Sequence, residues 1–145
     1  MTRIAREVYE RLVGEAKEAI EEMKDITSMS RDDFIKSRRA RFSLRYSIVM
    51  AVEALADLAI AILEKDFNEV VESYREAFMK LLEKGIISAE IAESMVKLVS
   101  LRNLIVHRYW VINDLRIYEE AKRGGIKVLE EFISEVSRYV EAEDP

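Results

Sequence analysis

The sequence contains no cysteine, which excludes disulfide bonds and thiolate metal sites. Proline occurs only as Pro145, and there are four glycines, so few residues interrupt helices. Glutamine is absent while Glu, Lys and Arg are abundant, a bias associated with proteins of hyperthermophiles. No apolar run approaches the roughly 20 residues of a membrane span, and the first residues lack the apolar middle of a signal peptide. We therefore expect a cytoplasmic protein that does not contact a membrane.

The net charge and the distribution of charged residues point in different directions on nucleic-acid binding. The chain carries a net charge of −5, which argues mildly against nucleic-acid binding. Between Arg31 and Arg45, however, six basic side chains face only two acidic ones. Arg38, Arg41 and Arg45 share a helical face through their spacing of three and four, and such a face could contact RNA phosphates. On this feature alone, a solvated face paired with acids elsewhere is the favoured interpretation.

Hydrophobic spacing predicts helices throughout the chain. We expect them over residues 3–25, 30–65, 68–84, from 88 to between 106 and 110, and from 113 or 114 to 140, with a bend or break at Gly124-Gly125. Ser30, Asn68 and Ser88 are expected N-caps, and Gly85 a left-handed stop. Short connections between amphipathic helices indicate an all-α, antiparallel up-and-down bundle of four to five helices in one domain, residues 1–145.

The expected helix that ends between residues 106 and 110 has an unusual composition. Its second half is apolar nearly all round, as in a helix covered on most sides. Arg102, Asn103 and His107 interrupt this apolar segment. Burying an arginine charge alone is very costly, so Arg102 has to be paired or to face a solvent-filled cleft.

Arg102 and His107 can also have purely structural roles. Arg102 can pair with a core carboxylate such as Glu53 or Asp57, and His107 can be a hydrogen-bonded core histidine. Arg102 and His107 lie about 140° apart around an ideal helix, so one straight helix does not direct both to the same point. Either the helix ends near His107, or two copies of the chain meet about a two-fold axis. Asn103 and His107 are four residues apart and can touch.

The segment from Arg102 to Tyr109 resembles the Arg-x4-His-x-Tyr motif of HEPN-domain proteins, and most closely that of the HepT toxins. The match includes the asparagine after the arginine, the trailing tyrosine, the chain length and the late position of the helix. Trp110 after Tyr109 and the long helix beginning near Arg38 are also similar to that family. The resemblance extends over essentially the whole chain.

The resemblance implies a ribonuclease that needs no metal or other cofactor. The chain's single histidine and its lack of a Glu-x-x-His pair agree with the absence of a metal site. RNA supplies its own nucleophile, the 2′-hydroxyl, so the enzyme has to move protons and stabilise charge on the phosphate. His107 suits the proton transfers, Arg102 the phosphate oxygens, and Asn103 the substrate or the histidine. A homodimer would combine two motifs in one cleft, and the products would end in 2′,3′-cyclic phosphate.

The resemblance also implies a partner, an MntA-like nucleotidyltransferase antitoxin that transfers AMP to Tyr109. Arg108 is expected to be an exposed charge within reach of RNA, and Trp110 a core or interface anchor. Two other functions remain possible on the sequence: a non-catalytic, nucleotide-binding companion of a nucleotidyltransferase, and a dimeric adaptor with a buried polar network. The acidic net charge fits the companion somewhat better than the enzyme.

Overall fold

The computed structural model describes residues 2–143, so residue 1 and residues 144–145 of the expected domain lie outside it. The helices are α1 (Arg6–Thr27), α2 (Arg31–Lys36), α3 (Arg38–Phe67), α4 (Tyr74–Glu83), α5 (Ala89–His107), α6 (Asp114–Glu120) and α7 (Ile126–Glu143), with a 3-10 turn η1 (Tyr109–Val111) and a π-helical turn η2 (Ala121–Gly125). Residues 2–143 contain no β-strand. The expected all-α class is therefore confirmed.

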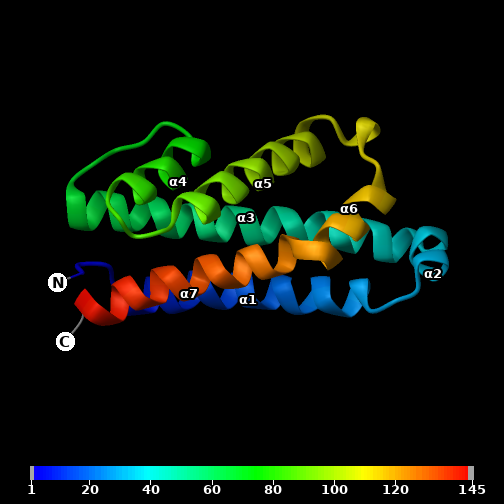
Figure 1. The fold of residues 1–145 in the computed structure, drawn as a ribbon, viewed down its shortest axis with the longest axis horizontal. Coiled ribbons are helices and arrows are strands. Elements are labelled where there is room, and N and C mark those ends of the chain that lie inside the picture. The colour runs from blue at the N-terminus through cyan, green and yellow to red at the C-terminus, as the bar shows by residue number, and fades with distance from the viewer. Residues whose placement is uncertain (1, 144–145) are drawn as a thin grey trace.

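Helix α3 is the centre of the bundle and packs against α1, α4 and α5 (Figure 1). Helices α1 and α5 run in one direction and α3 and α7 in the other, which confirms the antiparallel up-and-down arrangement. Alanines allow α1 and α3 to approach closely, because Ala16 of α1 and Ala51 and Ala59 of α3 are completely buried. The two chain ends lie at one end of the bundle, and the end of α5 lies toward the other.

Capping side chains set three of the helix starts where the sequence predicts them. The hydroxyl of Ser30 accepts a hydrogen bond from the Asp33 amide at 3.1 Å, and Ser88 caps α5 in the same way. Asn113 caps α6, as expected for a helix that begins near residue 113 or 114. Gly85 has φ +76° and ends the helix before it in the predicted left-handed conformation.

Two of the expected helices are wrong in their boundaries. The helix expected from residue 30 to 65 is broken at Ser37, whose backbone is extended and whose hydroxyl caps α3 through the Ala40 amide. Asn68 does not begin a helix. It ends α3 with a φ of 53°, a conformation that asparagine tolerates, and Ser73 caps α4. Serine and asparagine can serve at either end of an element, and the sequence alone did not distinguish these uses.

Helix α3 is more apolar than the sequence analysis indicated, although no uninterrupted apolar run in it approaches a membrane span. Within α3 one window is long and apolar enough to span a bilayer by length and composition. Glu53 and Asp57 divide this stretch in the sequence, which is why it does not read as one continuous run. In the bundle 61% of the window is buried, as in the core helix of a soluble protein.

The bend expected at Gly124-Gly125 takes the form of the π turn η2 between α6 and α7. The helical ribbon continues through it and changes direction (Figure 1). Single π turns inside helices insert an extra residue into the hydrogen-bond ladder and often lie at functional sites. The glycines weaken the helix at this point, which makes such a turn easier to form.

Candidate active site

His107 is the last residue of α5 and is exposed to solvent. After it the backbone of Arg108 turns out of the helix, with φ −141° and ψ 46°, and leads into η1. Within residues 2–143 the imidazole makes no hydrogen bond or ion pair. A buried, internally bonded core histidine is therefore not what the structure shows. Both ring nitrogens are open to a substrate or to a second protein chain.

Arg102, one and a half turns earlier, is held in place by its neighbours. Its Nε and Nη2 donate to Oε2 of Glu53 in α3 at 3.0 and 2.7 Å, and its Nη1 donates to Oδ1 of Asn103 at 2.9 Å. The guanidinium also lies over the ring of Tyr74, with 5.1 Å between Cζ and the ring centroid. The pairing with Glu53, one of the ordinary roles considered for this arginine, is thus present.

The Arg102–Glu53 pair is not sealed in the interior. The side chains of Arg102 and Glu53 are 19% and 37% exposed. Arg102, Asn103 and Tyr74 line a cavity of about 350 Å³ beside α4. The bonds described above use three of the five guanidinium N–H donors, so two remain for a ligand. Glu53 fixes the orientation of the guanidinium and offsets part of its charge.

Acidic groups surround this pair on the α3 side. Burial raises the pKa of the Asp57 carboxyl, and the nearby charges of Glu53 and Glu15 raise it further. Burial also raises the pKa of the Tyr74 hydroxyl, with smaller contributions from Asp57 and Glu53, while Arg102 acts in the opposite direction. The negative potential at this place stabilises the charged guanidinium.

Arg102 and His107 do not meet within one chain. Helix α5 continues without a break through His107, so the two side chains leave it about 140° apart. Of the two arrangements considered from the sequence, the helix end near His107 is present, since α5 ends at this residue, but no contact joins the two side chains in the described chain.

The surface around the motif is strongly apolar. Residues 2–143 expose ten large hydrophobic side chains, and five of them lie at the end of α5 and in η1: Leu104, Val106, Tyr109, Trp110 and Val111. We call these five residues the motif patch. The end of α5 was expected to be covered on most sides, but in the single chain it is open. Trp110 is 67% exposed, so it is not a core residue, and its ring is open to a second protein chain or to a stacked base.

Two aromatic residues near the motif were missed by the sequence analysis. Tyr46 is 69% exposed and lies two turns before Glu53 on the same face of α3. Because α3 and α5 are antiparallel, this places Tyr46 toward the end of α5 that carries His107 (Figure 1). Tyr74 reaches Arg102 from α4. Nothing in the motif's own sequence signals either residue, since both depend on how distant helices pack.

The basic candidates divide into bound and free side chains. Nε and Nη2 of Arg45 donate to the two carboxylate oxygens of Asp114 at 2.7 Å each, and Nε of Arg41 lies 3.5 Å from the same carboxylate. The hydrogen bond to Asp114 raises the pKa of Arg45. Arg38 and Arg108 are exposed. Among the described residues, no group of three or more His, Asp and Glu side chains could hold a metal ion.

Comparison with known proteins identifies the family. The model of the family described as "Ribonuclease HepT-like" matches residues 16–136. This chain belongs to that family. A relative from Archaeoglobus fulgidus, provisionally named an RNase, is 34% identical over 103 residues, which cover 69% of this chain and 74% of the relative. A second A. fulgidus relative with the same provisional name is 41% identical over 64 residues, covering 44% and 48% of the two chains.

Solved structures agree with the fold of this HepT-like chain. A tri-AMPylated HEPN toxin of Shewanella oneidensis, in complex with its MNT antitoxin, matches with a TM-score of 0.84 at 21% identity and covers 92% of this chain and 99% of its own. YutE of Bacillus subtilis, a cytosolic protein of unknown function, matches with a TM-score of 0.83 at 17% identity, over 99% and 96% of the chains. The family and the helical-bundle fold expected from the motif are confirmed.

Proposed function

We propose that this HepT-like protein is a cytoplasmic, metal-independent endoribonuclease that acts as the toxin of a toxin–antitoxin pair. The observation that carries the proposal is the position of His107. It is the only histidine of the chain, it ends a helix, and it lies exposed beside an uncovered apolar patch in a protein of the HepT-like family. The relatives provisionally named RNases and the structural similarity to a HEPN toxin support the same assignment.

The chemistry follows from the side chains. One His107 removes the proton of the RNA 2′-hydroxyl, whose oxygen attacks the adjacent phosphorus. The bond from phosphorus to the 5′-oxygen breaks, and that oxygen takes a proton from a second, protonated His107. Arg102 stabilises the negative charge on the phosphoryl oxygens, and Asn103 positions substrate or histidine. The products are a 2′,3′-cyclic phosphate and a 5′-hydroxyl. Arg38, Arg41, Arg45 and Arg108 are candidates for RNA contacts, the exposed Arg38 and Arg108 before the other two.

Two histidines require two chains, and the motif patch provides the surface for a homodimer. Contiguous exposed apolar side chains mark interaction sites in soluble proteins. Two-fold dimers bury the same patch of both subunits, which would bring the two motifs together. Such a dimer supplies the cover that the apolar end of α5 lacks in one chain. It also explains how Arg102 and His107 act on one phosphate although they diverge around the helix.

The test is cleavage of a single-stranded RNA in the presence of EDTA, with the product ends identified by mass spectrometry. We expect fragments that end in 2′,3′-cyclic phosphate, and no cleavage where a 2′-deoxynucleotide replaces the nucleotide before the scissile bond. Cleavage that requires a divalent cation, or that occurs at the deoxy position, would contradict the mechanism. Tight binding of ATP or AMP without any cleavage would favour the non-catalytic companion.

Tyr109 is proposed as the site at which a partner silences the enzyme. Its side chain is 62% exposed, so a nucleotidyltransferase can reach it without unfolding the bundle. The tyrosine oxygen attacks the α-phosphorus of ATP, the bond to the β-phosphate oxygen breaks, pyrophosphate leaves, and the tyrosine proton is released. An AMP group here places bulk and negative charge two residues from His107, where it would repel RNA.

We expect intact-mass analysis to show the addition of AMP units after incubation with an MNT-type nucleotidyltransferase and ATP, and cleavage to fall accordingly. Tyr109→Phe should abolish the mass gain. Tyr46→Phe is the matched control, because Tyr46 is equally exposed and lies on a different helix near the motif. A gain retained by Tyr109→Phe and lost in Tyr46→Phe would place the modification on α3 instead.

A further inference from the structure

The π turn η2 forms the wall of a hollow of about 530 Å³ between α1 and α7. Four basic side chains and one acidic side chain line it: Lys24, Lys122, Arg123, Lys127 and Glu130. We call it the π-turn hollow. The lining of this hollow is positively charged, although the chain as a whole has a net charge of −5. Gly124 also lines the hollow. A Cβ atom on Gly124 would meet no other atom within 4 Å, so the space next to its backbone is open.

Most of this charge is available to a ligand. Lys24 pairs with Glu130 at 2.9 Å. Lys127 lies 3.8 Å from Glu131, and the Lys127 side chain is 79% exposed, so this pair neutralises little. Lys122 lies over the ring of Tyr118 and makes no ion pair within residues 2–143. Arg123 is exposed and has no ion pair in the same described range.

The positive charge continues over the end of the molecule that carries the motif. Residues 31–45 contain six basic and two acidic residues, and residues 108–127 contain five basic and three acidic ones. The rest of the chain is therefore strongly acidic. Such a separation of charge steers a polyanion toward the basic end of the protein. The net charge of the protein does not show this effect, because it sums the basic and acidic regions.

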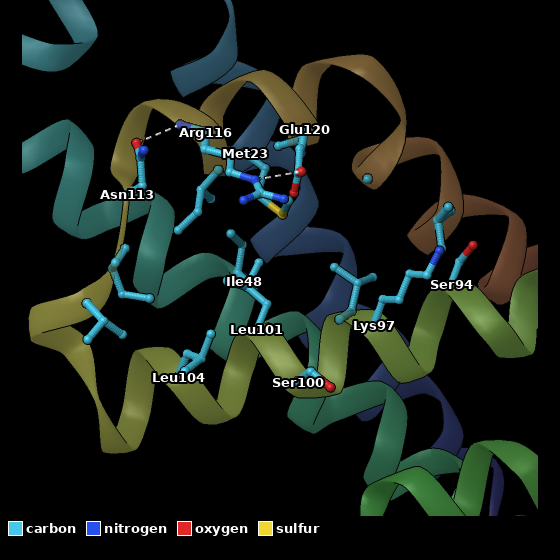
Figure 2. Close-up of a pocket in the computed structure, with 17 residues that line it drawn as sticks. Met23, Ile48, Ser94, Lys97, Ser100, Leu101, Leu104, Asn113, Arg116 and Glu120 are labelled. Carbon is cyan, nitrogen blue, oxygen red and sulfur yellow. Dashed lines mark hydrogen bonds and ion pairs between the residues drawn. The ribbon is translucent and has the colours of Figure 1, made fainter.

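A groove extends from the motif to the π turn, beside the π-turn hollow but separate from it. It has a volume of about 460 Å³ and extends from Leu104 and Val111 of the motif patch to Ala121 of the π turn, which also lines the hollow. Figure 2 shows its apolar floor, with Arg116 of α6 and Lys97 of α5 at its two sides. We call it the α5–α6 groove. Its floor can accept a base. At the rim Arg116 pairs with Glu120 and Lys97 with Glu93, but all four side chains are more than half exposed, so these pairs neutralise little of the charge that phosphates would meet.

We propose that the RNA strand follows the α5–α6 groove away from the motif, and that Lys122 and Arg123 bind one of its phosphates in the π-turn hollow. This inference rests on the proposed ribonuclease function and assigns its substrate a second contact region, remote from the cleaved bond. RNA accounts for the cations being distributed along a path from the motif, whereas a small anion would need only one of them.

The test measures binding of a fluorescently labelled single-stranded RNA to the His107→Ala protein by anisotropy at several salt concentrations. Adding Lys122→Glu and Arg123→Glu should weaken binding at least about tenfold and reduce the log–log salt slope by about 0.7 for each lost phosphate contact. The matched control is Lys17→Glu with Lys65→Glu, which makes the same charge change at exposed lysines of α1 and α3. Equal effects of both pairs would overturn the proposal.

Substrate length separates this inference from the function on which it rests. In the otherwise unmodified enzyme, Lys122→Glu with Arg123→Glu should raise KM for a long RNA and leave the cleavage of a dinucleotide unchanged. If the unmodified protein cleaves neither substrate, the ribonuclease assignment fails, and the binding measurement still decides whether the hollow binds RNA. If the variant binds RNA normally and loses a nucleotidyltransferase partner, the hollow is a protein-docking site and the proposal is wrong.

Discussion

His107→Ala is expected to reduce RNA cleavage by about 10²–10⁴-fold, the usual contribution of a positioned acid or base. The upper part of this range is the more natural expectation, because both proton transfers depend on the same residue in two copies. The measurement is single-turnover cleavage of a defined RNA with enzyme in excess, so that weaker binding does not obscure the chemical step.

His107→Ala should leave the fold unchanged, because the imidazole is exposed and makes no bond within the described chain. Its far-ultraviolet circular dichroism and thermal midpoint should match those of the unmodified protein. Arg108→Ala is the control, since it removes an adjacent exposed cation without a proton-transfer role. Undiminished cleavage by His107→Ala would remove this residue from the mechanism, as would an equal loss in both variants.

Asp114→Ala is expected to give the largest loss of stability, about 3 kcal/mol, because it leaves the largely buried Arg45 without its acidic partner and removes the carboxylate beside Arg41. The Asp114 carboxylate is only 11% exposed and joins Arg45 and Arg41 of α3 to the first residue of α6. For a chain of this length the thermal midpoint should fall by roughly 6 to 12 °C. Calorimetric or circular-dichroism melting measures it.

Glu120→Ala is the control for this prediction. Glu120 also pairs with an arginine in α6, Arg116, but both side chains are more than half exposed, and such pairs contribute little. A loss below about 1 kcal/mol in Asp114→Ala, similar to the control, would mean that the α3–α6 pairing is not structural. Arg41 and Arg45 would then be more accessible to RNA than the bundle indicates.

Local rules predicted much of the fold. Helix periodicity gave the all-α bundle, and Ser88, Gly85 and Asn113 mark real helix ends because each satisfies backbone groups next to it. Ser37 and Asn68 were not anticipated. Their conformations break or end a helix only because the surrounding bundle favours a turn there, and intrinsic preferences of such residues do not decide between the alternatives.

The sequence proposed the residues of the candidate site but did not predict their surroundings. The motif identified Arg102, Asn103 and His107, and the cost of burying a charge correctly indicated a carboxylate partner such as Glu53. The position of Tyr74 depends on the packing of α4, which no local pattern encodes. Hydrophobicity predicted that the end of α5 is covered, but in one chain it is open. Composition alone does not distinguish an apolar segment in a core from an apolar patch on the surface.

The central claim is that the two His107 side chains of a homodimer act on the same phosphodiester. Its most direct measurement is RNA cleavage by an equimolar mixture of the unmodified and His107→Ala proteins, before and after subunit exchange. Random exchange makes about half of the dimers mixed, and each mixed dimer has only one His107, so activity should fall from about half to about a quarter of that of the unmodified enzyme. A mixture that contains mixed dimers, as shown by native mass spectrometry, and keeps about half of the activity would contradict the account.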